Sequence, residues 1–207
     1  MYQIFAAFKY LHSGKVAHRD MKPNQVLLNK ELDVQICDFG LSRTVHNALL
    51  PSRTNIQNIF YRAPEFLLNK KFKYTNKIDI WSIGCIFYKL VSGQDFIRSA
   101  KTEYVAFSNV REKLGTPSLT FLSDLGIKID QNNIPFEQFP EKNATEGVEY
   151  TNNLALDLID KCLVWDPKRR ISAAEAMEHP YFKQLNQYDH EFIFDGYMDD
   201  GFENNNK

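Results

Sequence analysis

Apolar positions follow a helical period at the start of the chain and a strand-like pattern soon after it. In residues 1–14 the apolar side chains fall on one helical face, and Gly14 stands where a helix is expected to end. Residues 26–28 and 34–36 are short apolar runs, and the polar residues between them predict a hairpin turn. The polar stretch 41–59 shows no period and predicts a long loop. The face of the first helix is formed by Ile4, Phe5, Phe8 and Leu11.

The middle of the chain carries the most apolar segment. Residues 75–93 are apolar around most of a helical circumference, through Leu90 and Val91, and this predicts a buried helix. Residues 101–114 predict a further helix, and residues 116–150 are loop-rich.

Two more helices are predicted toward the end of the chain. One runs from about Asn153 to Leu163, and its inward face is expected to hold Leu154, Leu158, Ile159 and Cys162. Ser172 and Glu175 have the spacing of a capping box, which predicts a last helix that stops before Pro180. The whole pattern indicates a mainly α protein with one small β element.

Composition narrows the class of protein. Apolar residues make up 43% of the 207 residues and charged residues 25%, as in ordinary globular domains. Because 25 basic residues balance 26 acidic ones, the charge indicates neither a nucleic acid nor a membrane partner. The richest apolar stretch, residues 78–91, is too short to cross a bilayer. Cys37, Cys85 and Cys162 form no C-x-x-C pair, so we expect no zinc site and a reducing location, in the cytoplasm or nucleus.

Three short motifs carry the candidate chemistry. Residues 18–23 read His-Arg-Asp-Met-Lys-Pro and follow the first predicted helix. Residues 38–40 read Asp-Phe-Gly after the second predicted strand, and residues 63–65 read Ala-Pro-Glu at the end of the long loop. Taken singly, Asp20 and Asp38 are ordinary turn or capping residues, but three motifs in this order and setting are very specific.

On these motifs, the chain from residue 1 to about residue 183 resembles the large lobe of a eukaryotic protein kinase. The resemblance implies a mainly α fold, in which a helical bundle surrounds a buried central helix and carries a small β-hairpin. It also divides the chain into a catalytic loop at 18–25, an activation segment at 38–65, an insert region at about 94–150 and an acidic tail at 184–207.

The resemblance implies roles in phosphoryl transfer from ATP. Asp20 would accept the proton of the substrate hydroxyl, and Lys22 would place positive charge on the transferring phosphate. Asp38 would bind Mg²⁺, because carboxylate oxygen suits a hard cation, and Gln25 occupies the position of a second metal ligand.

Leu27 and Cys37 would line the nucleotide site in this family. The residues themselves leave alternatives open, since Leu27 also fits a core strand leucine and Cys37 a buried, inert thiol.

The form H-R-D-x-K-P is similar to that of serine/threonine kinases. Arg19, which precedes the catalytic aspartate, suggests regulation by a phosphate on the loop, paired with Arg19 and with Arg43. A solvated loop charge is an equal alternative for Arg43. Thr54, Thr44 and Ser52 are candidate phosphate acceptors, and nothing in the sequence selects one.

Other matches imply structural roles. Asp79 resembles the aspartate that braces the backbone around His18 and Arg19, and Glu65 and Arg170 resemble a buried ion pair.

Several stretches look most like the mitogen-activated and cyclin-dependent groups of kinases. Arg62 resembles the marker of these groups, which implies a pocket that favours proline after the target serine or threonine. In the mitogen-activated group an acidic C-terminal patch docks basic peptides, and Asp189 and Glu191 would serve here, although a solvated, disordered end is the plainer interpretation. The matching stretches are 2–4, 9–13, 36–43, 61–65, 114–118 and 163–167.

The chain also departs from the family pattern. Gln25 stands where the family has asparagine, which lengthens the ligand by one methylene. Residues 53–55 read Arg-Thr-Asn in place of Thr-x-Tyr, and Asn58 and Phe60 replace a threonine and a tryptophan.

The 207 residues contain neither a G-x-G-x-x-G loop nor a Val-Ala-Ile-Lys strand. We therefore expect a serine/threonine kinase large lobe without the small lobe, inactive when isolated, because an ATP site needs both walls. The alternative is a pseudokinase that acts as a binding module, which Gln25 and Asn58 favour and the Asp20, Lys22 and Asp38 set disfavours.

Overall fold

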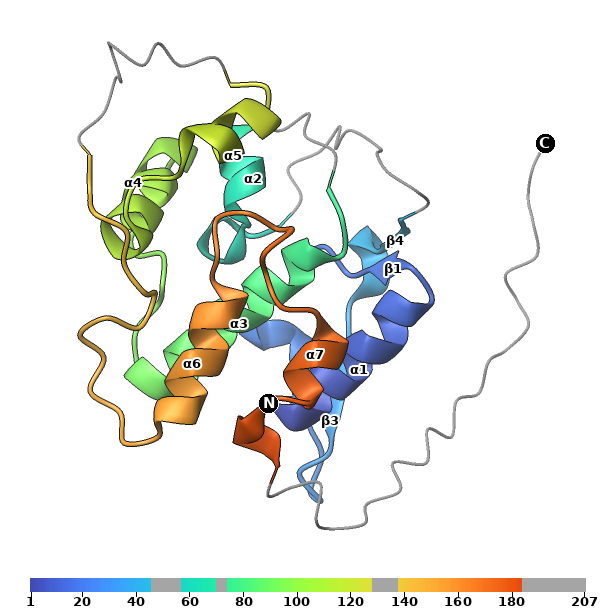
Figure 1. Cartoon of the computed structure of the whole chain (residues 1–207). Coiled ribbons are helices and arrows are strands. Elements are labelled where there is room, and N and C mark those ends of the chain that lie inside the picture. Colours follow the sequence, from blue (N-terminus) through green and yellow to red (C-terminus); the bar gives the residue numbers. More distant parts are fainter. Residues whose placement is uncertain (46–56, 70–73, 128–137, 184–207) are drawn as a thin grey trace, which may run out of the picture.

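The computed structural model describes residues 1–45, 57–69, 74–127 and 138–183, which form a mainly helical body (Figure 1). A mainly α fold with a small β element is therefore confirmed. Among the described residues, no helix has the length and apolar character needed to cross a membrane. The helices are α1 (Tyr2–Ser13), α2 (Pro64–Leu68), α3 (Lys77–Ser92), α4 (Glu103–Leu114), α5 (Leu119–Asp124), α6 (Asn153–Cys162) and α7 (Ala173–Met177).

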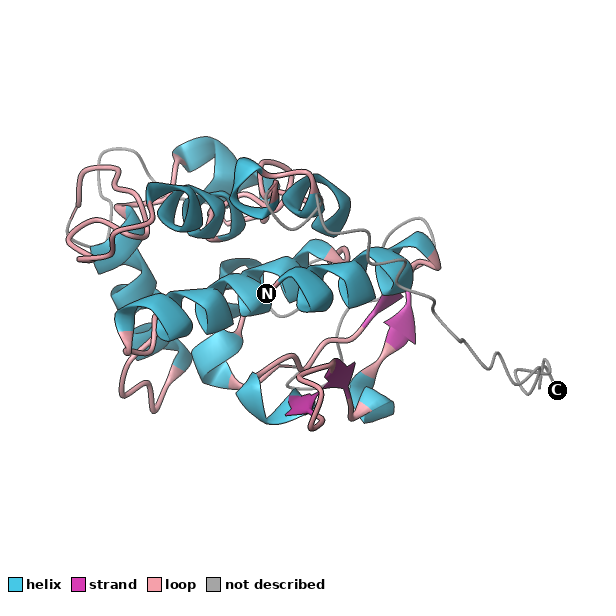
Figure 2. Cartoon of the chain, turned by 90° about the horizontal axis from the view of Figure 1, so that it is seen from below, coloured by secondary structure: helices cyan, strands magenta, loops and turns pink. Residues whose placement is uncertain are grey.

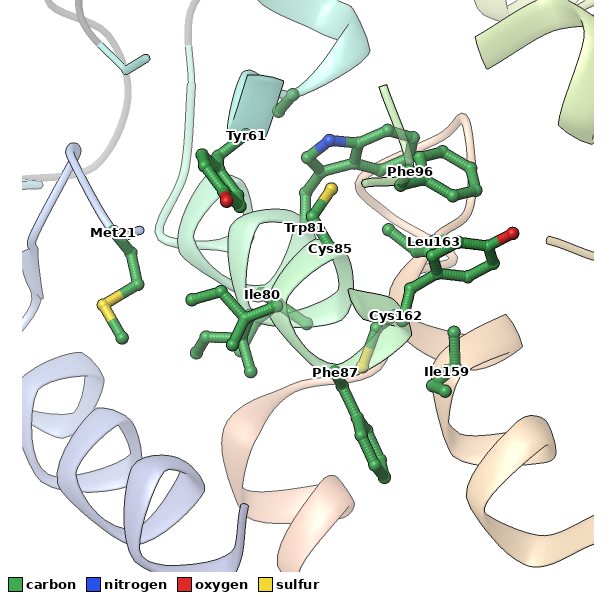
Figure 3. Packing of buried hydrophobic residues seen from close by; sticks show 14 of the residues in the cluster. Met21, Tyr61, Ile80, Trp81, Cys85, Phe87, Phe96, Ile159, Cys162 and Leu163 are labelled. Atoms are coloured by element: carbon green, nitrogen blue, oxygen red, sulfur yellow. The ribbon is translucent and has the colours of Figure 1, made fainter. Parts of the chain in front are cut away.

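Helix α3 runs through the middle of the molecule, as Figure 1 shows. Every residue from Ile78 to Tyr88 is buried, which agrees with the predicted buried helix. The prediction was wrong for Leu90, which is 67% exposed because the last turn of α3 emerges from the core. Figure 3 shows Trp81, Cys85 and Phe87 of α3 packed among apolar side chains of several other elements.

Helix α6 packs closely against α3 at a glycine. A Cβ atom added to Gly84 would lie 2.7 Å from Cβ of Cys162, so only glycine fits there without a shift of the two helices. Leu158, Ile159 and Cys162 face inward as predicted, whereas Leu154 is 44% exposed. The periodicity is correct for α6, but its first turn lies at the surface.

The other side of the core is closed by α1 and α7, which pack together. Helix α7 begins with the predicted capping box, in which Glu175 N–H donates to Oγ of Ser172 and Ser172 N–H donates to Oε2 of Glu175. The ring of Phe182, just after α7, lies edge-on to the ring of Phe5 in α1, with centroids 6.0 Å apart.

Two short antiparallel strand pairs lie at one side of the helical body (Figure 2). The predicted hairpin is present, with β2 (Val26–Leu28) paired to β3 (Val34–Ile36) so that Leu27 lies opposite Gln35. The second pair, β1 (Val16–Ala17) with β4 (Arg43–Thr44), was not predicted. It ties the start of the long loop to the segment that follows α1.

The predicted loops contain two further differences. Residues 59–61 form a 3₁₀ turn at the end of the predicted loop 41–59, and α5 lies within the region predicted to be loop-rich. Thr54, Ser52 and the Arg-Thr-Asn stretch lie outside the described residues, as do Asp189 and Glu191 of the predicted acidic tail.

One fully buried ion pair joins two distant parts of the chain. The guanidinium of Arg170 donates from Nη1 and Nη2 to the two carboxylate oxygens of Glu65, each at 3.1 Å, and both side chains are at most 1% exposed. Arg170 also donates to the carbonyls of Lys77 and Val164 and lies 5.1 Å from the ring of Trp81. The pair therefore fixes α2, the start of α3 and the segment before α7 relative to one another.

We expect Glu65→Ala or Arg170→Ala to lower the free energy of unfolding by about 3–5 kcal/mol, because each leaves an unpaired buried charge. Urea unfolding followed by tryptophan fluorescence measures this. The matched control is Asp124→Ala, which removes an exposed ion pair with Lys168 and should cost less than about 1 kcal/mol. Single variants at Glu65 and Arg170 as stable as the unchanged chain would contradict this interpretation.

Candidate active site

The carboxylate of Asp79 fixes the backbone at the start of the catalytic loop 18–25. Asp79, in the first turn of α3, is fully buried and accepts the backbone N–H groups of His18 and Arg19, each at 2.9 Å. Its Oδ2 also lies 3.0 Å from Nε2 of His12 in α1. A buried carboxylate needs such partners, and here they hold Arg19 in a left-handed conformation with φ of 69°.

Asp20 follows Arg19 in this loop, and only 9% of its surface is exposed. Its Oδ2 accepts from Nζ of Lys22 at 2.5 Å, and its Oδ1 accepts from the backbone N–H of Asn58 at 3.2 Å. The side chain of Asn58 does not take this contact, because its Oδ1 accepts from the N–H of Phe60 and caps the 59–61 turn. Asp20 is thus a nearly buried carboxylate with one ammonium and one amide partner.

The buried side chain of Gln25 contacts the exposed Asp38. Nε2 of Gln25 donates to Oδ2 of Asp38 at 3.0 Å, and Oε1 of Gln25 lies 3.6 Å from Sγ of Cys37. Asp38 itself is exposed and has a left-handed φ of 64°, two positions after the last residue of β3.

His18 connects the two halves of the site. Its Nε2 lies 3.0 Å from the carbonyl oxygen of Cys37, and its ring lies edge-on to that of Phe39, with centroids 5.0 Å apart. The catalytic loop and the Asp-Phe-Gly motif are therefore held in one arrangement. The predicted site residues form two groups, Asp20 with Lys22 and Gln25 with Cys37 and Asp38, and His18 joins the two groups through the carbonyl of Cys37.

The alternative interpretations of Leu27 and Cys37 required buried side chains, and neither side chain is buried. Leu27 is 49% exposed, so it is not a core leucine, because β2 presents it at the surface. Cys37 is partly exposed, so a buried thiol is also wrong. Leu28 and Phe39 nearby are 63% and 44% exposed.

Arg19 and Arg43 lie in different environments. The guanidinium of Arg19 is buried and donates to the hydroxyl of Tyr74 at 2.8 Å and to the carbonyl oxygen of Leu41. Arg43 is exposed in β4. Of the three candidate phosphate acceptors, Thr44 is exposed in β4, and Thr54 and Ser52 lie outside the described residues.

Gln57 is the main residue that the sequence analysis missed. It is 3% exposed and has a left-handed φ of 65°. Its carbonyl accepts from Nε and Nη2 of Arg62, and Nη1 of Arg62 donates to Oε1 of Glu103 in α4 at 2.7 Å. Burial lowers the pKa of the Arg62 guanidinium, and the carboxylate of Glu103 opposes that shift. A polar residue at the end of an unpatterned loop gives no sequence signal for such a role.

Comparison with known proteins identifies relatives across the whole chain. A family model described as the protein kinase domain matches residues 1–182. The mitogen-activated protein kinase sty1 of Schizosaccharomyces pombe is 37% identical over 210 residues, which cover 99% of this chain and 58% of the relative. Mitogen-activated protein kinase 5 of Arabidopsis thaliana is 35% identical over 212 residues, covering 98% of this chain and 54% of the relative. The chain thus spans about half the length of the curated relatives it matches.

We expect one thiol of three to react in the folded chain. Burial raises the pKa of the Cys162 thiol to about 12 and raises that of Cys85 as well, so almost no thiolate is present at pH 8. Cys37 is partly exposed and should be alkylated first by iodoacetamide. Peptide mass spectrometry at successive times measures this, and labelling in urea provides the control in which all three react. Labelling of Cys85 or Cys162 at the rate of Cys37 would show that the α3–α6 contact opens readily.

Proposed function

Because this chain belongs to the protein kinase family, we propose that it is the large lobe of a serine/threonine kinase similar to the mitogen-activated group. The reaction would transfer a phosphoryl group from Mg-ATP to a serine or threonine of a protein. The observation that carries the proposal is that His18 links the loop with the Asp20–Lys22 pair to the segment that carries Asp38, through the carbonyl of Cys37.

Each of these residues has a role that its position supports. Asp20 would orient the substrate hydroxyl and accept its proton, since one of its oxygens is fixed by the N–H of Asn58. Lys22, already bound to Asp20, would neutralise charge on the transferring phosphate. Asp79 would act on the reaction only through the backbone that it braces.

Asp38 and Gln25 would hold a magnesium ion, which would neutralise charge on the phosphates of ATP. Mg²⁺ binds through one or two protein carboxylates and keeps several waters. Asp38 would supply the carboxylate, and Gln25 has an amide oxygen within the same cluster. Leu27 and Cys37 beside them would contact the nucleotide.

The environment of Arg62 supports a preference for proline after the target residue. The resemblance places that substrate residue beside Arg62, and the carbonyl of Gln57 there already accepts two N–H groups of Arg62, at 2.8 and 3.3 Å. The carbonyl of Gln57 is therefore not available to accept an N–H group of the substrate. Proline has no N–H to donate, whereas any other residue at that position would bury an N–H without a partner.

We propose that the 207 residues alone are inactive, because the part that covers ATP and positions its phosphates must come from outside them. One observation favours the second candidate, a pseudokinase module. Gln25 turns its amide nitrogen toward Asp38, so a metal ligand of the usual polarity requires that the amide rotate. Docking of basic peptides on Asp189 and Glu191 would suit either candidate.

A fusion protein tests the proposal. The small lobe of a related mitogen-activated kinase is joined before Met1, and phosphorylation of a Ser-Pro peptide is measured with Mg-ATP. We expect activity in the fusion, none in the 207 residues alone, and loss of activity in the fusion with Asp20→Ala. A folded fusion without activity would instead support the pseudokinase candidate.

Gln25→Asn in the same fusion should raise the affinity of the site for Mg²⁺. The shorter side chain shifts the amide oxygen by about the length of one bond, and such shifts change rates by roughly a hundredfold. We expect a lower Mg²⁺ concentration for half-maximal activity and a higher kcat. The matched control is Gln35→Asn, an exposed residue of β3. An unchanged magnesium dependence would show that Gln25 takes no part in metal binding.

A further inference from the structure

We propose that the peptide unit between Gln57 and Asn58 positions Asp20, and that Glu103 of α4 holds this unit in place through Arg62. The inference rests on the proposed function for the role of Asp20, but the arrangement itself is testable without catalysis. Glu103, Arg62 and Gln57 are positioning residues in this account, because none of them touches the reacting atoms.

The peptide unit is held at both of its polar ends. Its carbonyl oxygen, from Gln57, accepts Nη2 of Arg62 at 2.8 Å and Nε at 3.3 Å. Its N–H, from Asn58, donates to Oδ1 of Asp20 at 3.2 Å. A peptide unit is planar, so a rotation that releases the carbonyl also turns the N–H away from the carboxylate. The contacts to Arg62 and to Asp20 are therefore coupled through one rigid group.

The side chain of Gln57 stabilises the unusual backbone at this point. A φ of 65° is unfavourable for a residue with a Cβ atom. The amide nitrogen of Gln57 donates to the carbonyl of Ile78 and to Oγ of Ser82, both in α3, at 3.1 and 2.9 Å. Its Oε1 accepts the N–H of Ala63 at 3.0 Å. These bonds attach the strained residue to the central helix.

Glu103 controls the other end of the arrangement. Nη1 of Arg62 donates to Oε1 of Glu103 at 2.7 Å, and the two side chains are 10% and 29% exposed. Without that carboxylate the buried guanidinium loses its charged partner and gains by moving toward water. The carbonyl of Gln57 then loses its donors, and the peptide unit is free to rotate.

This arrangement also explains how the chain accommodates Asn58. The resemblance implies a threonine at this position whose side chain touches the catalytic aspartate and lysine. Here the Asn58 side chain caps the 59–61 turn, and its backbone N–H contacts Asp20 instead. The backbone has no rotamers of its own, so its placement depends on what holds the peptide unit.

Amide hydrogen exchange in the 207-residue chain tests the inference directly. We expect Glu103→Ala to speed exchange of the Asn58 N–H by roughly tenfold or more, as loss of a hydrogen bond to a charged group implies. Asp20→Ala should do the same. The matched control is Glu146→Ala, which removes an exposed pair with Lys142 and should leave the Asn58 rate unchanged.

Glu103→Gln covers the case in which the alanine variant loses helical circular dichroism. Glutamine can still accept from Arg62, so we expect a smaller increase, roughly threefold. An Asn58 exchange rate that stays unchanged in a folded Glu103→Ala or Glu103→Gln variant would overturn the inference.

The kinase fusion provides a second readout that a merely structural role would not move. There Glu103→Ala should lower kcat and also reduce the preference for Ser-Pro over Ser-Ala peptides, while Glu146→Ala changes neither. An unaltered preference in an active Glu103→Ala fusion would count against the inference. If the unsubstituted fusion is inactive, the proposed function fails, and the exchange rates still decide whether Glu103 holds the peptide unit.

Discussion

The buried carboxylate of Asp79 is the constraint on which the rest of the site depends. A charge that has no access to water must be satisfied by protein donors, and this one is satisfied by two N–H groups of the catalytic loop and by His12 of α1. Helix α1, the loop and α3 are therefore fixed relative to one another before any substrate is present. The left-handed backbone of Arg19 follows from that arrangement, since both N–H groups must point to the same carboxylate.

The two departures from the family pattern at the site are accommodated in different ways. At Asn58 the side chain turns away and the backbone takes over the contact with Asp20, so the carboxylate keeps a donor. At Gln25 the longer amide stays in place and donates to Asp38. The first change preserves the polarity of the contact, whereas the second reverses it.

Local patterns predicted the longer helices and the hairpin but not the β1–β4 pair or α5, whose positions depend on long-range contacts. Helices α1 and α3, the hairpin and the Ser172 capping box have signals within a few residues of one another. Leu90 and Leu154 were predicted to be buried but are exposed. Periodicity shows which face of a helix is apolar, but not how far neighbouring elements cover that face. The motifs selected Asp20 and Asp38, but Gln57 depends on a left-handed φ and on partners up to 25 positions away.

The exposed apolar side chains of Leu27, Leu28 and Phe39 have a consequence for how the molecule behaves in solution. With a net charge of −1 and an isoelectric point near 6.5, copies of this chain repel one another only weakly at neutral pH. Attraction between apolar surfaces then has little to oppose it. Within the described part of the chain, the region around β2 and the Asp-Phe-Gly motif is therefore one apolar surface through which two copies of the isolated chain can associate.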